Sequence, residues 1–259
     1  MCPFFRSRSP ESSAPAEPVA TVFPKIDGAD IGAVLVGQRV AGDFYDSVRV
    51  SPERVLFGLL DVSGRREENR SLLATAQDVF RNFGGELFSR ADLNESDAMT
   101  ELCLRINRSL IEVSPGIHPC PAFIACYHEK FGTLCYTNAG HTPGLLRDSS
   151  GIAELAPTGL PLGLFSHATC DAPTIGMDKG AVLLLVSRGV VACSRKECGG
   201  DEEESPEQFS LDRVKTLLQA APSSTAQALS ASVLDAVGKF SSGLPVRDDR
   251  TALALVRTA

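Results

Sequence analysis

The chain alternates short hairpin-like strand pairs with amphipathic helices, and this order limits the folds open to it. Two valine-rich runs within 48–57, joined by Ser-Pro-Glu-Arg, are typical of a β-hairpin, and a second hairpin is expected within 121–146. Between them, apolar residues recur at helical spacing over 67–89 and again over 97–113, where Ser96 is a candidate N-cap. Hairpins around helical blocks favour antiparallel sheets covered by helices over a parallel, doubly wound sheet.

The C-terminal part continues the same pattern. The uninterrupted apolar run 181–186 predicts a strand buried on both faces. A short helix is expected over 210–221, and Ser224 with Gln227 three residues later forms a capping-box signature that opens another helix. The run 252–256 predicts a final strand, so the sequence offers strands at both ends of one domain.

Length and charge narrow the classes of protein. The 259 residues can bury one large core, and no linker divides them after a Ser-, Pro-, Glu- and Ala-rich leader at 1–18, which is expected to be disordered. This leaves one domain over 19–259. The net charge of −7 argues against a nucleic-acid partner, and the acidic run 201–204 indicates a solvated loop. No apolar run is long enough to span a bilayer and no secretory signal opens the chain, so a cytoplasmic protein with no membrane partner is expected.

Eight cysteines are scattered along the chain. In the absence of a secretory signal, reduced thiols are expected rather than a disulfide framework. Cys126 and Cys135 lie in apolar strand-like runs, where free cysteine behaves as a small hydrophobic residue. Cys193 and Cys198 have no second pair of metal-ligand spacing beside them, so a zinc- or thiol-based function is the least supported of three candidate functions.

Carboxylates lie beside strand-like runs at three places in the chain. Asp43 and Asp46 precede one strand, Asp61 ends the next, and Asp248 and Asp249 open the last. Each motif alone is explained by turn chemistry, because Asp and Gly favour turns. Together, carboxylates at several strand ends can converge on a hard divalent cation, which lowers the pKa of a bound water for attack on a phosphate ester.

These motifs resemble the PPM family of metal-dependent Ser/Thr protein phosphatases, and the bacterial branch of SpoIIE and RsbU in particular. Five segments match that branch's motifs in order along the domain. They are Val-Ala-Gly-Asp-Phe-Tyr-Asp at 40–46, Leu-Asp-Val-Ser-Gly at 60–64, Tyr-Thr-Asn-Ala-Gly-His with Pro and Leu-Leu at 136–146, Gly-Leu-Pro-Leu-Gly at 159–163 and Asp-Asp-Arg-Thr at 248–251.

The resemblance implies an α+β fold, a four-layer α-β-β-α sandwich of two antiparallel sheets flanked by helices. It also implies hydrolysis of a phosphorylated signalling protein, such as an anti-sigma-factor antagonist, with one or two Mn or Mg ions. Asp61 would bridge two ions, and Asp43 would order metal-bound waters. These two residues would be the catalytic ones. The full implied ligand set is Asp43, Asp46, Asp61, the Val62 carbonyl, Asp248 and Asp249. In the Asn138–His141 motif, a turn is expected rather than a catalytic group.

Two positions depart from the family pattern. Arg188 stands where the family has a metal-binding Asp, and Arg66 stands where it has a glycine. Since Arg cannot ligate a metal, we hypothesise that its guanidinium occupies or displaces one metal subsite and pairs with Asp61 or Asp248. The alternative is that Arg188 points to solvent beside a degraded site. Two functions stay open: a phosphatase with an altered metal site, and an inactive pseudophosphatase that binds a signalling partner.

Overall fold

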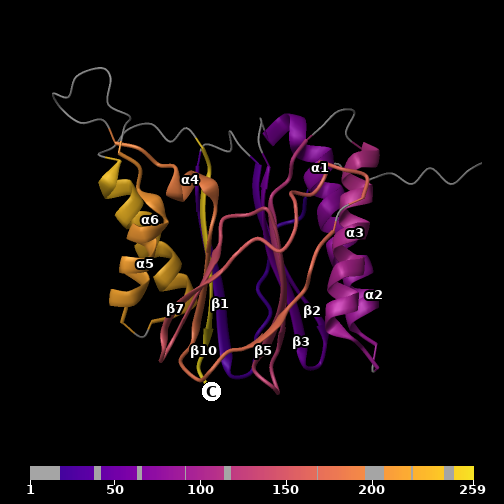
Figure 1. The fold of residues 1–259 in the computed structure, drawn as a ribbon, viewed down its shortest axis with the longest axis horizontal. Coiled ribbons are helices and arrows are strands. Elements are labelled where there is room, and N and C mark those ends of the chain that lie inside the picture. The colour runs from indigo at the N-terminus through magenta and orange to yellow at the C-terminus, as the bar shows by residue number, and fades with distance from the viewer. Residues whose placement is uncertain are drawn as a thin grey trace, which may run out of the picture.

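The structure, a computed structural model, describes residues 18–37, 42–62, 66–90, 92–113, 118–167, 169–195, 207–222, 224–241 and 248–259. In it, two five-stranded antiparallel sheets lie face to face, and helices cover the outer face of each sheet (Figure 1). This is the four-layer α-β-β-α sandwich that the family resemblance implies.

Each sheet draws its strands from distant parts of the chain. The first sheet has the order β1-β10-β9-β6-β7 and the second the order β2-β3-β4-β5-β8. The strands of the first sheet are β1 (Ala29–Val36), β6 (Gly144–Asp148), β7 (Gly151–Leu155), β9 (Val182–Val186) and β10 (Arg250–Arg257). Those of the second are β2 (Gly42–Ser51), β3 (Arg54–Val62), β4 (Ala122–His128), β5 (Thr133–Ala139) and β8 (Thr174–Gly176).

The helices form two groups, one on each side of the sandwich (Figure 1). Those on the second sheet are α1 (Arg66–Asp78), the π-helix η1 (Val79–Phe83), α2 (Gly84–Phe88) and α3 (Glu95–Val113). Those on the first sheet are α5 (Ser210–Ala220) and α6 (Ala226–Phe240), with the short α4 (Arg188–Val191) at the upper end in Figure 1.

Alternation along the strands divides the core into three layers. On β3, Leu56 packs into the cluster beneath α1 and α3, whereas the next residue, Phe57, packs between the sheets. On β9, Leu184 faces α5 and α6, and Leu185 faces the other sheet. Successive strand residues point to opposite faces, so both of these central strands must be apolar on both sides.

The main elements expected from the sequence are confirmed. The 48–57 hairpin is β2–β3, the 121–146 hairpin contains β4–β5, and the doubly buried run is β9, which lies between β10 and β6. The helix expected over 67–89 is interrupted, because η1 separates α1 from α2.

Both predicted N-caps are wrong by one or two residues. At α3 the cap is Asn94, whose Oδ1 accepts the backbone N–H of Ser96 at 3.1 Å, while the Ser96 hydroxyl donates to the Ala172 carbonyl at 2.7 Å. At α6 the capping side chain is Thr225 rather than Ser224. Neighbouring polar residues satisfy the same capping pattern, and tertiary contacts decide which of them caps the helix.

Some predictions fall outside the described residues. These are the disordered leader apart from residue 18, the acidic loop at 201–204 and Cys198 of the considered zinc pair. Among the described residues, no helix has the length and apolar character needed to cross a membrane.

Candidate active site

The centre of the candidate site is a pair of carboxylates on neighbouring strands. Asp43 on β2 lies directly opposite Asp61 on β3 in the antiparallel register, so both side chains project from the same face of the second sheet. Both are buried, with 5% and 8% of their surface exposed. Like charges directly opposite each other are unfavourable in a sheet, so this pair needs partners that supply positive charge or hydrogen bonds.

Those partners come from the first sheet. The Thr251 hydroxyl on β10 donates to Asp43 Oδ2 at 2.7 Å, and the Ser187 hydroxyl also bonds that carboxyl group. The backbone N–H of Arg188, at the start of α4, donates to Asp61 Oδ2 at 2.9 Å. The carboxylate pair therefore lies where the ends of β9 and β10 meet β2 and β3, between the sheets.

Arg188 makes a second contact at this rim. Its guanidinium Nη2 lies 3.3 Å from Asp248 Oδ2, with the two side chains 55% and 41% exposed. Of the two carboxylates expected to pair with the guanidinium, Asp248 does so, whereas Asp61 is bonded by the backbone of Arg188 and not by its side chain. The adjacent Asp249 is buried, and its charge acts on Asp43.

The environment of Asp43 opposes ionisation. Burial is the largest cause, the charge of Asp61 is the next, and together they outweigh the Ser187 and Thr251 hydrogen bonds and raise the pKa of Asp43 to about 8. Below about pH 8, Asp43 therefore keeps its proton, and its ionisation at this position has an electrostatic cost. A cation between the two carboxylates would relieve that cost.

Replacing Asp43 with Asn should stabilise the metal-free domain. The pKa of Asp43 is about 8 in the folded protein, against 3.8 for a free aspartate, which represents the unfolded chain. The folded state therefore binds more protons between these values, and the wild type loses stability as the pH rises from about 4 to about 8. Asp43→Asn keeps the Thr251 hydrogen bond and removes this titration. In EDTA, the Tm of the variant is expected to exceed that of wild type at pH 8, with the difference shrinking towards pH 4. A difference that is constant with pH would contradict this account.

The Asn138–His141 motif forms a tight turn beside the carboxylates. Asn138 Oδ1 accepts the backbone N–H of His141 at 2.8 Å, and Gly140 adopts a φ of 68° where a Cβ would lie 2.6 Å from Pro161. His141 is buried, with Nδ1 3.0 Å from the Thr142 carbonyl, and the Asp61 charge acts on its ring. Burial nevertheless lowers the pKa of His141, so the neutral ring is favoured.

Sequence reasoning missed three polar groups of this site. Ser187 and Thr251 bond Asp43, and His141 lies within electrostatic reach of Asp61. Thr251 and His141 belong to two of the family motifs, but their residue types alone predict no contact with these carboxylates. Ser187 carried no signal of its own, because a serine after an apolar strand is commonplace.

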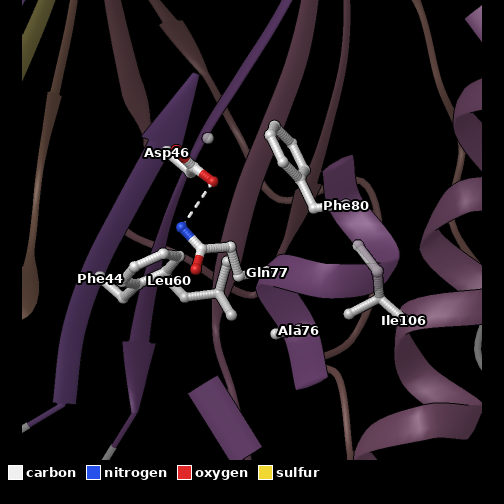
Figure 2. Close-up of a pocket in the computed structure, with 8 residues that line it drawn as sticks. Phe44, Asp46, Leu60, Ala76, Gln77, Phe80 and Ile106 are labelled. Carbon is white, nitrogen blue, oxygen red and sulfur yellow. Dashed lines mark hydrogen bonds between the residues drawn. The ribbon is translucent and has the colours of Figure 1, made fainter. Parts of the chain in front are cut away.

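Asp46 is not brought together with the other predicted ligands. It lies on the opposite face of β2 from Asp43 and points towards the helices, where Figure 2 shows it bonded to Gln77. Both residues line a small, mainly apolar cavity of about 10 Å³. Arg81 of η1 donates to both carboxylate oxygens, at 2.6 and 2.8 Å, and the Thr21 hydroxyl donates at 3.0 Å. This carboxylate joins the N-terminal segment, β2 and the helix layer.

Removal of the Asp46 carboxylate is therefore expected to affect stability rather than cation binding. Asp46→Ala removes the carboxylate partner of Arg81, while Gln77 keeps its bonds to the Val19 backbone. The free energy of unfolding should fall by about 3 kcal/mol. Asp78→Ala, which removes an exposed carboxylate bonded to Asn82, is the control and should change stability by less than about 0.5 kcal/mol. Urea denaturation gives both values. A stable Asp46→Ala variant that had lost Mn binding would identify Asp46 as a ligand instead.

Close packing at Gly189 fixes the position of α4. A Cβ on Gly189 would lie 2.0 Å from the Asp249 carbonyl oxygen and 3.2 Å from Asp248 Cβ. Gly189→Ala is therefore expected to lower the free energy of unfolding by about 2–3 kcal/mol and to displace the Arg188 N–H from Asp61. Gly238→Ala in α6, where nothing lies within 4 Å, should instead raise stability by up to about 1 kcal/mol. Equal effects of the two substitutions on urea denaturation would be inconsistent with this packing.

The donor set fits one cation better than two. Asp43 and Asp61 offer oxygen donors and buried negative charge, with the Val62 carbonyl next along β3, as a hard divalent cation requires. The charge of Asp248 is matched by the guanidinium. Across the described ranges, no group of three or more His, Cys, Asp or Glu side chains stands ready to hold a metal ion.

The fold is that of PPM-type phosphatase domains, and the sequence comparison agrees. Residues 51–258 match the family model of stage II sporulation protein E (SpoIIE), and the chain belongs to this family. The PP2C domain of SiaA from Pseudomonas aeruginosa has the same fold, with a TM-score of 0.71 and 15% identity over 88% of this chain and 86% of that domain.

Two curated proteins are similar in sequence. Protein IcfG of Synechocystis sp. (strain ATCC 27184 / PCC 6803 / Kazusa) is 23% identical over 257 residues, which cover 91% of this chain and 39% of IcfG. Phosphoserine phosphatase RsbP of Bacillus subtilis (strain 168) is 23% identical over 186 residues, which cover 70% of this chain and 45% of RsbP. The chain thus spans less than half the length of either relative.

Proposed function

We propose that this domain hydrolyses phosphoserine or phosphothreonine in a phosphorylated signalling protein, such as an anti-sigma-factor antagonist. The observation that carries the proposal is the buried Asp43–Asp61 pair, held between the two sheets by hydroxyl and backbone donors. The family membership and the phosphoserine phosphatase activity in the name of RsbP support this reaction class.

The chain's own residues have distinct parts in this proposal. Asp61, Asp43 and the Val62 carbonyl would hold one Mn or Mg ion, which supplies a water of lowered pKa for attack on phosphorus. Thr251 and Ser187 fix the orientation of Asp43, and the Arg188 N–H fixes that of Asp61. These hydrogen bonds prepare the carboxylates for a cation before it arrives.

Arg188 would supply part of the positive charge that a second metal ion would otherwise provide. Its guanidinium supplies one positive charge beside Asp248, where a divalent ion would supply two, and it cannot activate a water. Being half exposed, it keeps N–H donors that can bind a phosphate oxygen of the substrate. We therefore expect a domain that binds phosphate and turns over more slowly than an enzyme with two metal ions.

A pseudophosphatase is the second candidate. The Arg188–Asp248 ion pair and the lack of a ready three-ligand cluster among the described residues favour it. In this function the site would still recognise a phosphorylated side chain, through the guanidinium and without hydrolysis.

Phosphate release from phosphoserine and phosphothreonine peptides, measured with Mn, with Mg and with EDTA, separates these candidates. The enzyme is expected to release phosphate with Mn or Mg and none with EDTA. Asp235→Asn, an exposed carboxylate on α6, is the control and should behave as wild type. Peptide binding without release under all three conditions would replace the enzyme with the pseudophosphatase.

A further inference from the structure

Two buried thiols outside the acidic site lie in direct contact. Cys103 on α3 and Cys170, in the segment between β7 and β8, have their Sγ atoms 3.1 Å apart, although they are 67 residues apart in sequence. Formation of a disulfide would require the two sulfurs to approach by about 1 Å, to the usual bond length.

We propose that Cys103 and Cys170 form a reversible oxidation site, in which a peroxide converts the two thiols into a disulfide that fastens α3 to the segment between β7 and β8. The proposal concerns this thiol pair and does not depend on the proposed phosphatase activity.

The roles of the two sulfurs are unequal. Cys103 donates a hydrogen bond to Cys170, which lowers the pKa of Cys170, whereas this bond and burial raise the pKa of Cys103. Thr137 also bonds both sulfurs in a way that favours the thiolate. Burial raises the pKa of the other described cysteines, which are Cys120, Cys126, Cys135 and Cys193. Cys170 is thus the preferred first nucleophile within the described part of the chain.

Cys170 is the less buried of the two residues, with 6% of its surface exposed against 0% for Cys103. Its neighbours Thr169 and Asp171 are exposed, and its own backbone pairs with Gly159, so the sulfur lies just beneath a surface segment. Cys103 is fully buried behind it. Because Cys170 lies nearer the surface, it is the expected first target of a small oxidant such as hydrogen peroxide, and Cys103 is positioned to resolve the product.

The chemistry balances with one peroxide for each pair. The Cys170 thiolate attacks a peroxide oxygen, the O–O bond breaks, and the products are a Cys170 sulfenic acid and, after proton transfer, water. Cys103 sulfur then attacks the Cys170 sulfur, the S–S bond forms, and the sulfenic oxygen leaves as a second water. Two thiols are oxidised by two electrons in total, and the peroxide accepts both.

The cross-link would reach the turn beside the carboxylates through hydrogen bonds. Cys170 pairs with Gly159, and the backbone N–H of Gly159 donates to the Asn138 carbonyl at 3.2 Å. Asn138 in turn holds the backbone of His141. A disulfide at Cys170 would therefore restrain the segment that supports this turn.

The test uses the full chain with Cys2 and Cys198 replaced by Ser, so that only the six described cysteines can react. The protein is exposed to one to five equivalents of hydrogen peroxide, alkylated under denaturing conditions and digested. Mass spectrometry is expected to show a Cys103–Cys170 disulfide peptide and the loss of two alkylatable thiols per chain. The Tm should rise by about 5–10 °C and return to its starting value with dithiothreitol.

Variants assign the roles. Cys103→Ser should leave a Cys170 sulfenic acid that dimedone traps, and Cys170→Ser should lose no thiol at the same peroxide concentration. Cys126→Ser removes a thiol from the same hydrophobic cluster and should form the disulfide as before. Absence of the Cys103–Cys170 peptide in the folded background protein, or equal thiol loss in Cys170→Ser, would overturn the proposal; neither result depends on a variant of Cys103 folding.

Discussion

Replacing Arg188 with aspartate is expected to increase the stabilisation of the domain by Mn and to raise Mn-dependent phosphate release at least about tenfold. Arg188→Asp removes the guanidinium from Asp248 and adds a carboxylate at the rim where Asp61 already lies. The backbone N–H that bonds Asp61 is retained, because every non-proline residue has one. The substitution changes the local charge by two units, which is the charge of one divalent ion.

Differential scanning fluorimetry with and without Mn measures this effect. A cation present at 100 times its Kd adds about 2.7 kcal/mol to the free energy of unfolding, which corresponds to about 5–10 °C in Tm for a domain of this size. In EDTA, the variant should be less stable than wild type, because it gathers carboxylates without a counter-charge.

Arg90→Asp provides the matched control for charge. Arg90 is also 55% exposed and pairs with Glu86 at 3.6 Å, so the substitution changes the net charge equally and breaks a comparable ion pair far from the site. It should alter neither the Mn response nor phosphate release. If Arg188→Asp and Arg90→Asp responded alike to Mn, the assignment of Arg188 to a metal subsite would be wrong.

Replacing Asp61 with asparagine is expected to lower Mn-dependent phosphate release at least about 100-fold. Asp61 lies opposite Asp43 and accepts the backbone N–H of Arg188. Its negative charge should therefore contribute strongly to the binding of any cation at this site. Asp61→Asn keeps the shape of the side chain and one oxygen that can accept the Arg188 N–H. The substitution therefore removes charge with little change in packing.

For the metal-free domain, the same substitution is expected to raise stability. At about pH 8 and above, where Asp43 also ionises, removal of the facing Asp61 charge relieves their repulsion. Asp61→Asn should then have a higher Tm than wild type in EDTA and a smaller increase with Mn. Asp235→Asn is the control for both measurements. If Asp61→Asn retained full Mn-dependent activity, the cation would lie elsewhere; if it were merely unfolded, circular dichroism in EDTA would reveal this.

Local sequence patterns were sufficient to predict the strands and helices whose apolar residues follow a regular spacing. Apolar alternation gave the β2–β3 and β4–β5 hairpins, and helical spacing gave α3 and α6. Strands β6 and β7 were missed because each is only five residues long; β7 is also partly exposed, with little apolar periodicity. The π-helix was also missed, since its sequence continues the apolar face of α1.

The sequence predicts which residues belong to the candidate site, but not the directions in which their side chains point. Asp43 and Asp46 belong to one motif, yet an odd spacing on a strand places them on opposite faces of the sheet. The alternation of strand side chains places Asp43 and Asp46 on opposite faces, but it does not show which of the two residues faces the other sheet. The partners of Asp46, which are Gln77 and Arg81, decide that its face is towards the helices.

The sequence by itself determined the fold class, the order of the acidic motifs and the presence of a guanidinium where the family has a carboxylate, because these follow from residue type and spacing. Only the tertiary structure decided that Arg188 offers its backbone to Asp61 and its side chain to Asp248, and that Cys103 touches Cys170. Such contacts join residues more than 50 positions apart. Their distances are set by how the two sheets and their helices pack, which no local pattern records.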